Sequence, residues 1–529
     1  MNLGLKLETF LLASTVAVTR FVFRSHELYD LDSVNFALAI ERFSPRVHQP
    51  HPPGYFLYVC LGRVLNSMIH DANLALVILS VAASCGVVIM IYLTALEWFG
   101  VGAARFAGIL FLFSPLAWFH GTVALTYGAE AFFSALLGYL CWKIDRGSVA
   151  FIAPASVILG ISAGVRPSSL LFLGPLLLFS LRKTTSKRKL VGATALILTL
   201  VSWFVPMIWV SGGFATYFGA LLSLWQLVPS NGTVFNSSPA TSIARAGTIA
   251  FIYLLCFGAA SLAPLGGLIG SNKVDSRKKI FTTVWIGPAL CFFTLIFLKF
   301  VNSGYLLLLS APACIWLGFW ASEWYRNSSW RRSWKLALIG LCAAVNVLIF
   351  LASPLYCSYR SVRRFESELR SVRTALLQLD PSGKTLLIGF DAHFLGFRHA
   401  GYYLPGYLTL EYPEVNLREG TRIFAMYDRD TRLLTTLPIA AYSRFVLFPL
   451  PGGDVAYQQY LQKVETVLPK ESLRSVHLAS RDFVSAPIAD LPLLFPGVMS
   501  AGEPRVYAPL QSAMPRVNIR EHQPGPKGS

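Results

Sequence analysis

Acidic and imidazole side chains gather in one polar loop near the start of the chain. Asp30 and Asp32 stand on either side of a leucine, and His48 and His51 follow in the same loop. A carboxylate held against an apolar wall can accept a proton from a hydroxyl group, and a histidine can contact an anion. Asp32 is therefore the candidate general base, and Asp30 is the weaker candidate for the same role.

Two amphipathic segments flank these side chains. Residues 33–41 and 55–68 have helical periodicity, which predicts interfacial helices that lie on a membrane rather than cross it. Asp32 stands where the first helix would begin, and Asp is a favoured N-cap residue. The alternative to a catalytic Asp32 is thus a residue that only caps a helix, and spacing alone does not decide between the two.

The composition as a whole is that of a membrane protein. The chain has 529 residues, of which 54% are hydrophobic and 14% are charged, and its mean hydropathy is +0.54. Soluble domains carry about 25% charged residues, and a membrane crossing needs about 20 apolar helical residues. We therefore predict a polytopic α-helical membrane protein with about eleven transmembrane helices. They are expected at residues 7–23, 74–97, 104–120, 123–142, 149–165, 168–181, 190–211, 247–269, 281–298, 303–321 and 335–353.

Basic residues are concentrated in alternate loops. The net charge is +18, and the loops at 143–146, 182–189, 273–279 and 326–335 are rich in Lys and Arg, whereas the loops between them hold few. Cytoplasmic loops are enriched in these residues, so the N-terminus is predicted inside and the C-terminus outside. The loop at 24–73 and the region after residue 353 then lie outside. No basic stripe is interleaved with aromatic residues, so nucleic acid is not a predicted partner.

The region after the last span has the pattern of a small α/β domain. Residues 359–379 have a helical period. Strand-like runs follow at 384–390, 407–411, 422–427, 444–450 and 475–479, with a helical stretch at 455–467. We predict a transmembrane domain over 1–353, an extracytoplasmic α/β domain over 354–514 and a disordered tail over 515–529. Arg398 and His399 lie in an aromatic, cationic segment that either lines a substrate site or forms a turn of this domain.

Ionisable residues also occur near the ends of the predicted spans. Glu130 lies with Tyr127 near the outer end of the fourth span, and Arg166 lies in the outer turn between the fifth and sixth. Ionisable side chains at membrane depth are energetically unfavourable and often functional. The alternatives are an interhelical hydrogen bond for Glu130 and interfacial anchoring for Arg166. Arg20, near the outer end of the first span, is expected to extend toward the interface.

The first outer loop resembles a motif of the GT-C superfamily of membrane glycosyltransferases, which includes protein O-mannosyltransferases and aminoarabinose transferases. Those families place an acidic pair and an aromatic residue after the first span, and a Lys/His-Pro-Pro turn with Gly and an aromatic residue further on. The corresponding segments here are Asp32-Ser33-Val34-Asn35-Phe36 and His51-Pro52-Pro53-Gly54-Tyr55. Ser33 replaces the common second acid, and Asn35 stands where some relatives carry an Arg that contacts the donor phosphate.

The resemblance implies an enzyme that moves a sugar, a hexose or a pentose, from a polyprenyl-phosphate donor to an acceptor hydroxyl on a lipid, glycan or protein. The reaction would take place at the outer (periplasmic or lumenal) face, with Asp32 as general base. His51 occupies the turn position that contacts the donor phosphate, and His48 and Arg166 are further candidates for that contact. The substrate-binding candidates are Asn35, Tyr55, Tyr127, Glu130, Arg398 and His399.

The sequence gives less information on whether the protein needs a metal ion and on the membrane in which it lies. In relatives, a second acid in the loop that here holds Glu130 binds metal or orients the acceptor. Neither Glu130 nor His48 has enough partners in the sequence to predict a metal site, so no metal ligand is assigned and the need for a divalent metal stays open. The expected location is the bacterial inner (plasma) membrane, as a multi-pass protein with its C-terminus outside.

Two other function classes compete with the enzyme. A membrane transporter or lipid flippase is the first alternative, but such proteins often have internal repeats and helices broken near the midplane, and the sequence shows neither. A non-catalytic scaffold is the second. It would explain the outer domain but would give Asp32 and His51 no task.

Overall fold

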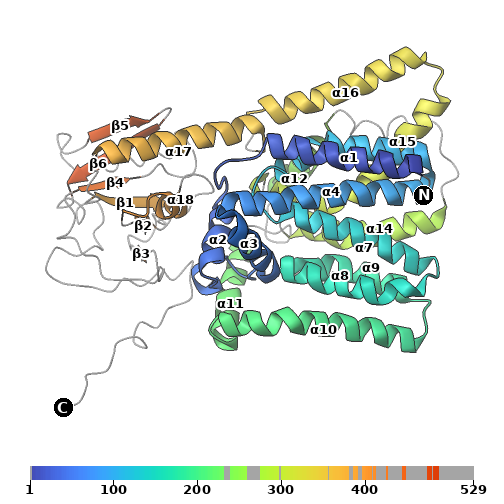
Figure 1. The fold of residues 1–529 in the computed structure, drawn as a ribbon, viewed down its shortest axis with the longest axis horizontal. Helices are drawn as coiled ribbons and strands as arrows, with labels where there is room; N and C mark the ends of the chain where they lie inside the picture. The colour runs from blue at the N-terminus through green and yellow to red at the C-terminus, as the bar shows by residue number, and fades with distance from the viewer. Residues whose placement is uncertain are drawn as a thin grey trace. The chain divides into compact units, whose positions relative to one another are not determined.

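The protein folds into a mostly helical structure that divides into two compact units (Figure 1). The computed structural model describes residues 3–230, 239–258, 275–296, 300–354, 357–379, 385–390, 396–407, 409–412, 425–426, 444–447, 474–478 and 481–487. Unit 1 comprises Met1–His26, Pro53–Gly212 and Val228–Val362. Unit 2 comprises Glu27–Pro52, Gly213–Leu227 and Arg363–Ser529. The sequence-predicted helix at 455–467 and tail at 515–529 lie outside the described residues.

Unit 1 contains the helices that correspond to the predicted spans. They are α1 (Leu3–Val22), α4 (Ala72–Phe99), α5 (Val101–Leu112), α6 (Pro115–His120), α7 (Tyr127–Asp145), α8 (Ile152–Val165), α9 (Ser168–Leu181), α10 (Ser186–Val210), α12 (Pro239–Phe257), α14 (Ser276–Leu295), α15 (Ser310–Asn327) and α16 (Arg332–Ala352). A further helix, α3 (Phe56–Ile69), matches the second predicted interfacial helix. In the described part of the chain, four helices are long and apolar enough to cross a membrane: Ala72–Phe99, Ser186–Val210, Ser303–Asn327 and Arg332–Ala352. Several apolar helices are thus confirmed, while the number of crossings stays a prediction.

One predicted span is broken. The sequence predicts a continuous helix over 104–120, but α5 ends at Leu112 and α6 begins at Pro115. Pro115 has no backbone N–H and therefore cannot donate to the carbonyl of Phe111 four residues earlier. Ser114 instead caps α6, since its Oγ accepts a hydrogen bond of 3.3 Å from the Ala117 amide.

Arg20 adds a second donor to the Phe111 carbonyl, which also accepts a 3.2 Å hydrogen bond from the Ser114 amide. Arg20 Nη2 donates a 3.3 Å hydrogen bond to the Phe111 carbonyl, and its guanidinium lies 5.0 Å from the ring centroid of Trp118. The side chain is fully buried, so the expectation that Arg20 extends to the interface is wrong. A buried cation at the C-terminal end of α5 is favourable because the last carbonyls of a helix carry partial negative charge.

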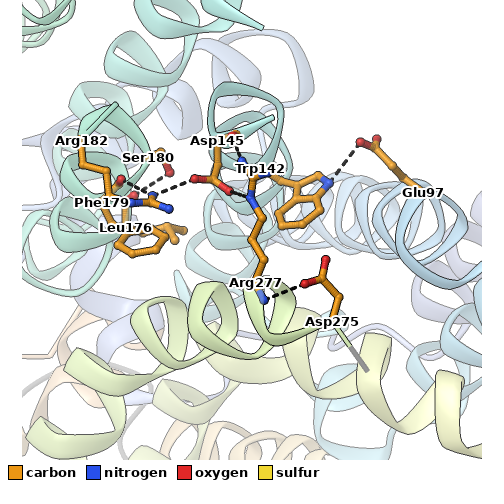
Figure 2. A network of polar contacts seen from close by, with 9 residues as sticks. All are labelled: Glu97, Trp142, Asp145, Leu176, Phe179, Ser180, Arg182, Asp275 and Arg277. Atoms are coloured by element: carbon orange, nitrogen blue, oxygen red, sulfur yellow. Dashed lines mark hydrogen bonds and ion pairs between the residues drawn. The ribbon is translucent and has the colours of Figure 1, made fainter. Parts of the chain in front are cut away.

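A polar network joins the ends of three helices of unit 1 (Figure 2). The basic loops predict that this end of unit 1 is cytoplasmic. Asp145 ends α7, Arg182 caps the C-terminus of α9, and Arg277 lies in the first turn of α14. Arg182 Nη1 donates to Asp145 Oδ1 at 2.7 Å, and Arg277 Nε donates to the other carboxylate oxygen. The buried carboxylate therefore holds together the ends of three helices that are far apart in sequence.

We expect Asp145→Asn to lower the free energy of unfolding by about 1–3 kcal/mol, since hydrogen bonds between charged groups stabilise more than neutral ones and a buried group left without its partner costs about this much. Thermal unfolding in lipid nanodiscs measures the change. Asp275→Asn is the matched control, because Asp275 is an N-cap residue that Asn replaces well. An Asp145→Asn melting curve equal to that of the control would show that the two arginines do not depend on this charge.

Unit 2 contains the first part of the outer loop and the described elements after residue 362. Its helices include α2 (Leu31–Glu41), a 3-10 turn at Pro45–Val47, most of α17 (Tyr359–Leu379) and α18 (Phe397–Tyr403). Six strands, β1 (Thr385–Phe390), β2 (Thr409–Tyr412), β3 (Ala425–Met426), β4 (Arg444–Leu447), β5 (Arg474–Leu478) and β6 (Arg481–Pro487), form a sheet in the order β3-β2-β1-β4-β6-β5. The strand β1 pairs in parallel with β2 and β4, and the other pairings are antiparallel. Three elements have no counterpart among the sequence predictions: β6, α11 (Phe214–Ser230) and the helix α18, where a substrate-lining segment or a turn was predicted.

Candidate functional site

Asp30 and Asp32 have different structural positions at the start of α2. The helix begins at Leu31, and Asp30 is its N-cap: Asp30 Oδ1 accepts a 2.9 Å hydrogen bond from the Asp32 amide. The capping alternative is therefore wrong for Asp32 and applies to Asp30. Asp32 lies in the first turn, where the partial positive charge of the helix N-terminus favours a carboxylate. The cap fixes the backbone that carries Asp32.

We expect Asp30→Ala to lower the free energy of unfolding by about 1 kcal/mol, whereas Asp30→Asn retains the cap and the stability. Denaturant or thermal unfolding of both variants tests this. Equal stability of Asp30→Ala and the native protein would mean that the cap is dispensable.

Asp32 meets His51. The Nδ1 atom of His51 lies 3.2 Å from Oδ1 of Asp32, and the two side chains are 19% and 32% exposed. The carboxylate and the imidazole are thus adjacent and reachable from solvent, which a group that exchanges protons with a substrate requires. Nδ1 of His51 is buried and faces the Asp32 carboxylate.

The loop that carries His51 has an unusual backbone. Ser44 and Gln49 pair through two backbone hydrogen bonds of 2.6 and 3.0 Å, which close the turn before His51. His48 and Tyr55 have φ values of +56° and +47°, in the left-handed region that non-glycine residues rarely adopt. For a bulky residue such as Tyr55 this conformation costs about 1–2 kcal/mol. Strain of this kind is common at functional sites.

His48 is close to the same pair but has a different charge. The residue keeps some exposed surface, yet burial of its ring, with a smaller effect of the nearby Arg398, lowers the pKa of His48 to about 3. His48 is then uncharged at neutral pH and can offer a phosphate a hydrogen bond but no positive charge. The cation beside it is Arg398, which lies on α18 and is buried.

The segment that holds Arg398 forms a helix that packs against α2 within unit 2. The Leu28 amide donates a 2.6 Å hydrogen bond to the Tyr403 hydroxyl, and the His399 ring packs edge-on against Phe365 at 5.3 Å. His399 is therefore a buried packing residue in this structure, while Arg398 lies near His48. Asn35 is buried in α2, and its Oδ1 has no hydrogen-bond partner within the described part of the chain.

Glu130 and Arg166 form a second polar cluster, which belongs to unit 1. Arg166 Nε lies 3.1 Å from Glu130 Oε2, at an angle too oblique for a hydrogen bond, and both side chains are at most 5% exposed. Ser168 Oγ donates to Glu130 Oε1 at 3.2 Å, and Arg166 Nη1 donates to Thr126 at 2.8 Å. The charge of Arg166 is thus matched inside the protein, so contact with a donor phosphate would compete with Glu130.

Aromatic rings surround the guanidinium of Arg166. Its central carbon lies 4.2, 4.6 and 5.7 Å from the ring centroids of Tyr305, Tyr127 and Tyr55. These cation–π contacts stabilise the buried charge. The structure therefore brings together three sequence-predicted residues of this cluster, Tyr127, Glu130 and Arg166, with Tyr55 at its edge.

His120 is a buried polar residue of this cluster that the sequence patterns did not indicate. It ends α6, is fully buried, lies 5.0 Å from Tyr127 between ring centroids, and neither ring nitrogen has a hydrogen-bond partner among the described residues. Its position as the last residue of a predicted apolar span was a signal that could have identified it. Among the residues that the structure describes, no group of three or more His, Cys, Asp or Glu side chains could hold a metal ion.

Comparisons with known proteins agree with this fold. Residues 43–190 match the family model described as the N-terminal domain of protein O-mannosyl-transferase TMEM260. The structure is similar to ArnT from Cupriavidus metallidurans bound to undecaprenyl phosphate, with 14% identity, 92% of this chain and 98% of that chain covered, and a TM-score of 0.56. The resemblance to the GT-C superfamily is confirmed.

Two further structures extend the comparison. For ArnT in the apo state the identity is 13%, with 91% of this chain and 98% of that chain covered and a TM-score of 0.53. The Archaeoglobus fulgidus oligosaccharyltransferase in the apo form has 13% identity, 76% and 64% coverage and a TM-score of 0.45. No curated protein matches the chain. The likeness to ArnT is one of fold, and the matched family model, over residues 43–190, begins after Asp30, Asp32 and Asn35.

Proposed function

We propose that the protein is a glycosyltransferase that moves a sugar from a polyprenyl-phosphate donor to an acceptor hydroxyl at the outer face of the membrane. The observation that supports this most is the contact between Asp32 and His51 at 3.2 Å in a solvent-accessible loop. ArnT, whose fold this chain shares, has been seen with undecaprenyl phosphate. The name of the matched family model makes mannose the first sugar to test.

Asp32 is the proposed general base. As the acceptor oxygen bonds to the anomeric carbon, the hydroxyl proton passes to the carboxylate. The bond from that carbon to the phosphate oxygen breaks on the opposite side, so the configuration at the anomeric carbon is inverted. Positioned proton acceptors contribute about 10²–10⁴-fold to such reactions. Glu130 is less suitable because it is almost fully buried and paired with Arg166, whereas Asp32 keeps a third of its surface exposed.

His51 and Arg398 are the proposed partners of the leaving phosphate. The phosphate gains negative charge as the glycosidic bond breaks, and fixed cations or N–H donors at that point lower the barrier. His48, uncharged at neutral pH, can add a neutral hydrogen bond. Asn35 and Tyr55 are proposed sugar contacts. Tyr127 and Glu130 are proposed substrate contacts on the basis of the sequence resemblance, and Arg166 is the weaker phosphate candidate because it is paired with Glu130.

The proposed setting is the bacterial plasma membrane, with the loop of Asp32 and the C-terminal α/β region outside. An outer site suits a lipid-linked donor, because the polyprenyl chain stays among apolar helices while the sugar-phosphate meets the acceptor in water. Lipids, glycans and proteins are all open as acceptors.

The test supplies purified protein in lipid with undecaprenyl-phosphate and dolichyl-phosphate sugars, mannose first, together with crude acceptor extracts. Mass spectrometry then measures release of free polyprenyl phosphate. We expect release with at least one donor. No release with any donor or extract would refute the proposal, and substrate movement across sealed vesicles without a covalent product would instead support a transporter or flippase.

A further inference from the structure

The ends of α7, α9 and α14, which Asp145 joins, carry more positive than negative charge. Among the described residues of these ends the acids are Asp145 and Asp275, and the cations are Arg146, Arg182, Lys183, Arg277, Lys278 and Lys279. We call these six cations the basic surface. The Asp145 carboxylate is 1% exposed and is shared by Arg182 and Arg277, so it neutralises the charge of only one of them. The basic surface therefore keeps an excess of positive charge that an anion from outside the chain can balance.

Arg182 presents an unused hydrogen-bonding edge. Its Nη1 donates to Asp145 Oδ1 and to the Phe179 carbonyl, both at 2.7 Å, and its central carbon lies 3.6 Å from the Phe179 ring centroid (Figure 2). Within the described part of the chain, Nε and Nη2 have no acceptor, and the side chain is 33% exposed. An arginine uses two such parallel N–H groups to bind two oxygens of one phosphate.

Exposed apolar side chains place this edge at the boundary of a membrane. Leu178, one helical turn before Arg182 on α9, is 71% exposed, and Leu171, two turns before Leu178, is 60% exposed. Residues four and seven apart lie on the same face of a helix. The helix α10, which is long and apolar enough to cross a membrane, begins four residues after Arg182. A cation at the end of such an apolar face lies at the depth of the phospholipid headgroups.

A lipid fits this combination better than a soluble anion. A free phosphate could accept the hydrogen bonds of Arg182 but would leave Leu178 and Leu171 uncovered. Gly174, on the same face between the two leucines, has open space beside it, since a Cβ there would meet no heavy atom within 4 Å. An acyl chain can therefore lie along α9 while the phosphate to which it is linked meets Arg182.

We propose that the basic surface binds an anionic phospholipid, whose phosphate accepts hydrogen bonds from Nε and Nη2 of Arg182 and whose acyl chain lies along Leu178 and Leu171. The other cations of the basic surface attract the headgroup by charge, as basic clusters beside membrane helices do. This inference does not depend on the proposed glycosyl transfer. It requires only that helices of unit 1 cross a membrane.

The test uses mass spectrometry of the intact, full-length protein in detergent micelles to measure bound lipid. Phosphatidylglycerol is compared with phosphatidylcholine of the same acyl chains, and inorganic phosphate is added as a soluble competitor. Arg182→Gln removes the charge and the paired donors, whereas Arg182→Lys keeps the charge and lacks the planar pair. Arg105→Gln is the matched control, because Arg105 is also exposed but its donors are used in two hydrogen bonds to Glu8 of 2.6 and 3.0 Å.

A second measurement separates lipid binding from stability, since Arg182→Gln also loses the contact with Asp145. Thermal unfolding of each variant is compared in nanodiscs of phosphatidylcholine with and without phosphatidylglycerol. The shift is taken within each variant, so a lower stability of the variant itself does not enter. A ligand that binds only the folded state raises the unfolding temperature, and we expect this rise to be smaller in Arg182→Gln than in the native protein.

We expect the native protein to retain phosphatidylglycerol in preference to phosphatidylcholine, and Arg182→Gln to bind phosphatidylglycerol about tenfold more weakly. Arg182→Lys should bind with intermediate strength, and Arg105→Gln should bind as the native protein does. Equal binding by Arg182→Gln and the native protein would overturn the proposal. An equal loss in Arg105→Gln would also overturn it, because net charge alone would then attract the lipid. Displacement of the lipid by inorganic phosphate would identify a soluble anion as the ligand and would contradict a phospholipid site.

Discussion

Asp32→Asn is expected to lower kcat for sugar transfer about 10²–10⁴-fold, the range that a positioned proton acceptor contributes. The amide cannot take the proton of the acceptor hydroxyl, yet it has the shape of the carboxylate and can stay beside His51. Donor binding should change little, since the proposed phosphate partners are His51 and Arg398. Rates of polyprenyl phosphate release and KM for the donor are the measurements.

Asp71→Asn is the matched control for this variant. Asp71 caps α4 through a 3.0 Å hydrogen bond from the Leu74 amide, and Asn serves equally well at that position. Both variants should unfold at the temperature of the native protein. Full activity of Asp32→Asn would remove Asp32 as the base and would direct attention to Glu130, despite its burial.

Apolar periodicity predicted most of the helical fold, because a membrane helix must present an uninterrupted apolar length. The predicted span at 168–181 has the same bounds as α9, and α2 and α3 match the two predicted interfacial helices closely. The break between α5 and α6 was missed although Pro115 was visible, because the cost of a proline depends on whether another donor replaces the lost bond. The Ser114 amide and Arg20 both donate to the Phe111 carbonyl, and Arg20 is 91 residues from Phe111 in the sequence.

Pattern alone could place the loop residues near one another but could not assign their contacts. The sequence predicted Asp32 as the N-cap of the helix, but the N-cap is Asp30, two residues earlier. Which of the two caps the helix depends on the backbone conformation, which the sequence pattern does not show. The proximity of Arg398 to His48 joins segments more than 300 residues apart, beyond the reach of any local rule. The family resemblance proposed the site residues, and the structure shows the contacts that each of them makes.

Arg166→Met is expected to lower the free energy of unfolding by about 3–5 kcal/mol, since it leaves a buried carboxylate without its cation. Glu130 is 1% exposed, so water cannot replace the lost partner. The variant Glu130→Gln with Arg166→Met should recover most of the loss, because no uncompensated charge remains and Met fills much of the space among the tyrosine rings. Thermal unfolding in lipid nanodiscs of both single variants and the double variant completes the cycle.

The pair of Glu8 and Arg105 provides the contrast for this cycle. Its atoms approach to 2.6 Å, closer than those of Glu130 and Arg166, but Arg105 is 57% exposed. Water screens such a pair, so Arg105→Met should change stability far less than Arg166→Met. Equal losses at the two sites would mean that water reaches Glu130 in the native protein. Arg166 would then be accessible to a donor phosphate, which is the role that the sequence resemblance implies. In that case Arg166→Met should raise KM for the donor while lowering the free energy of unfolding only slightly.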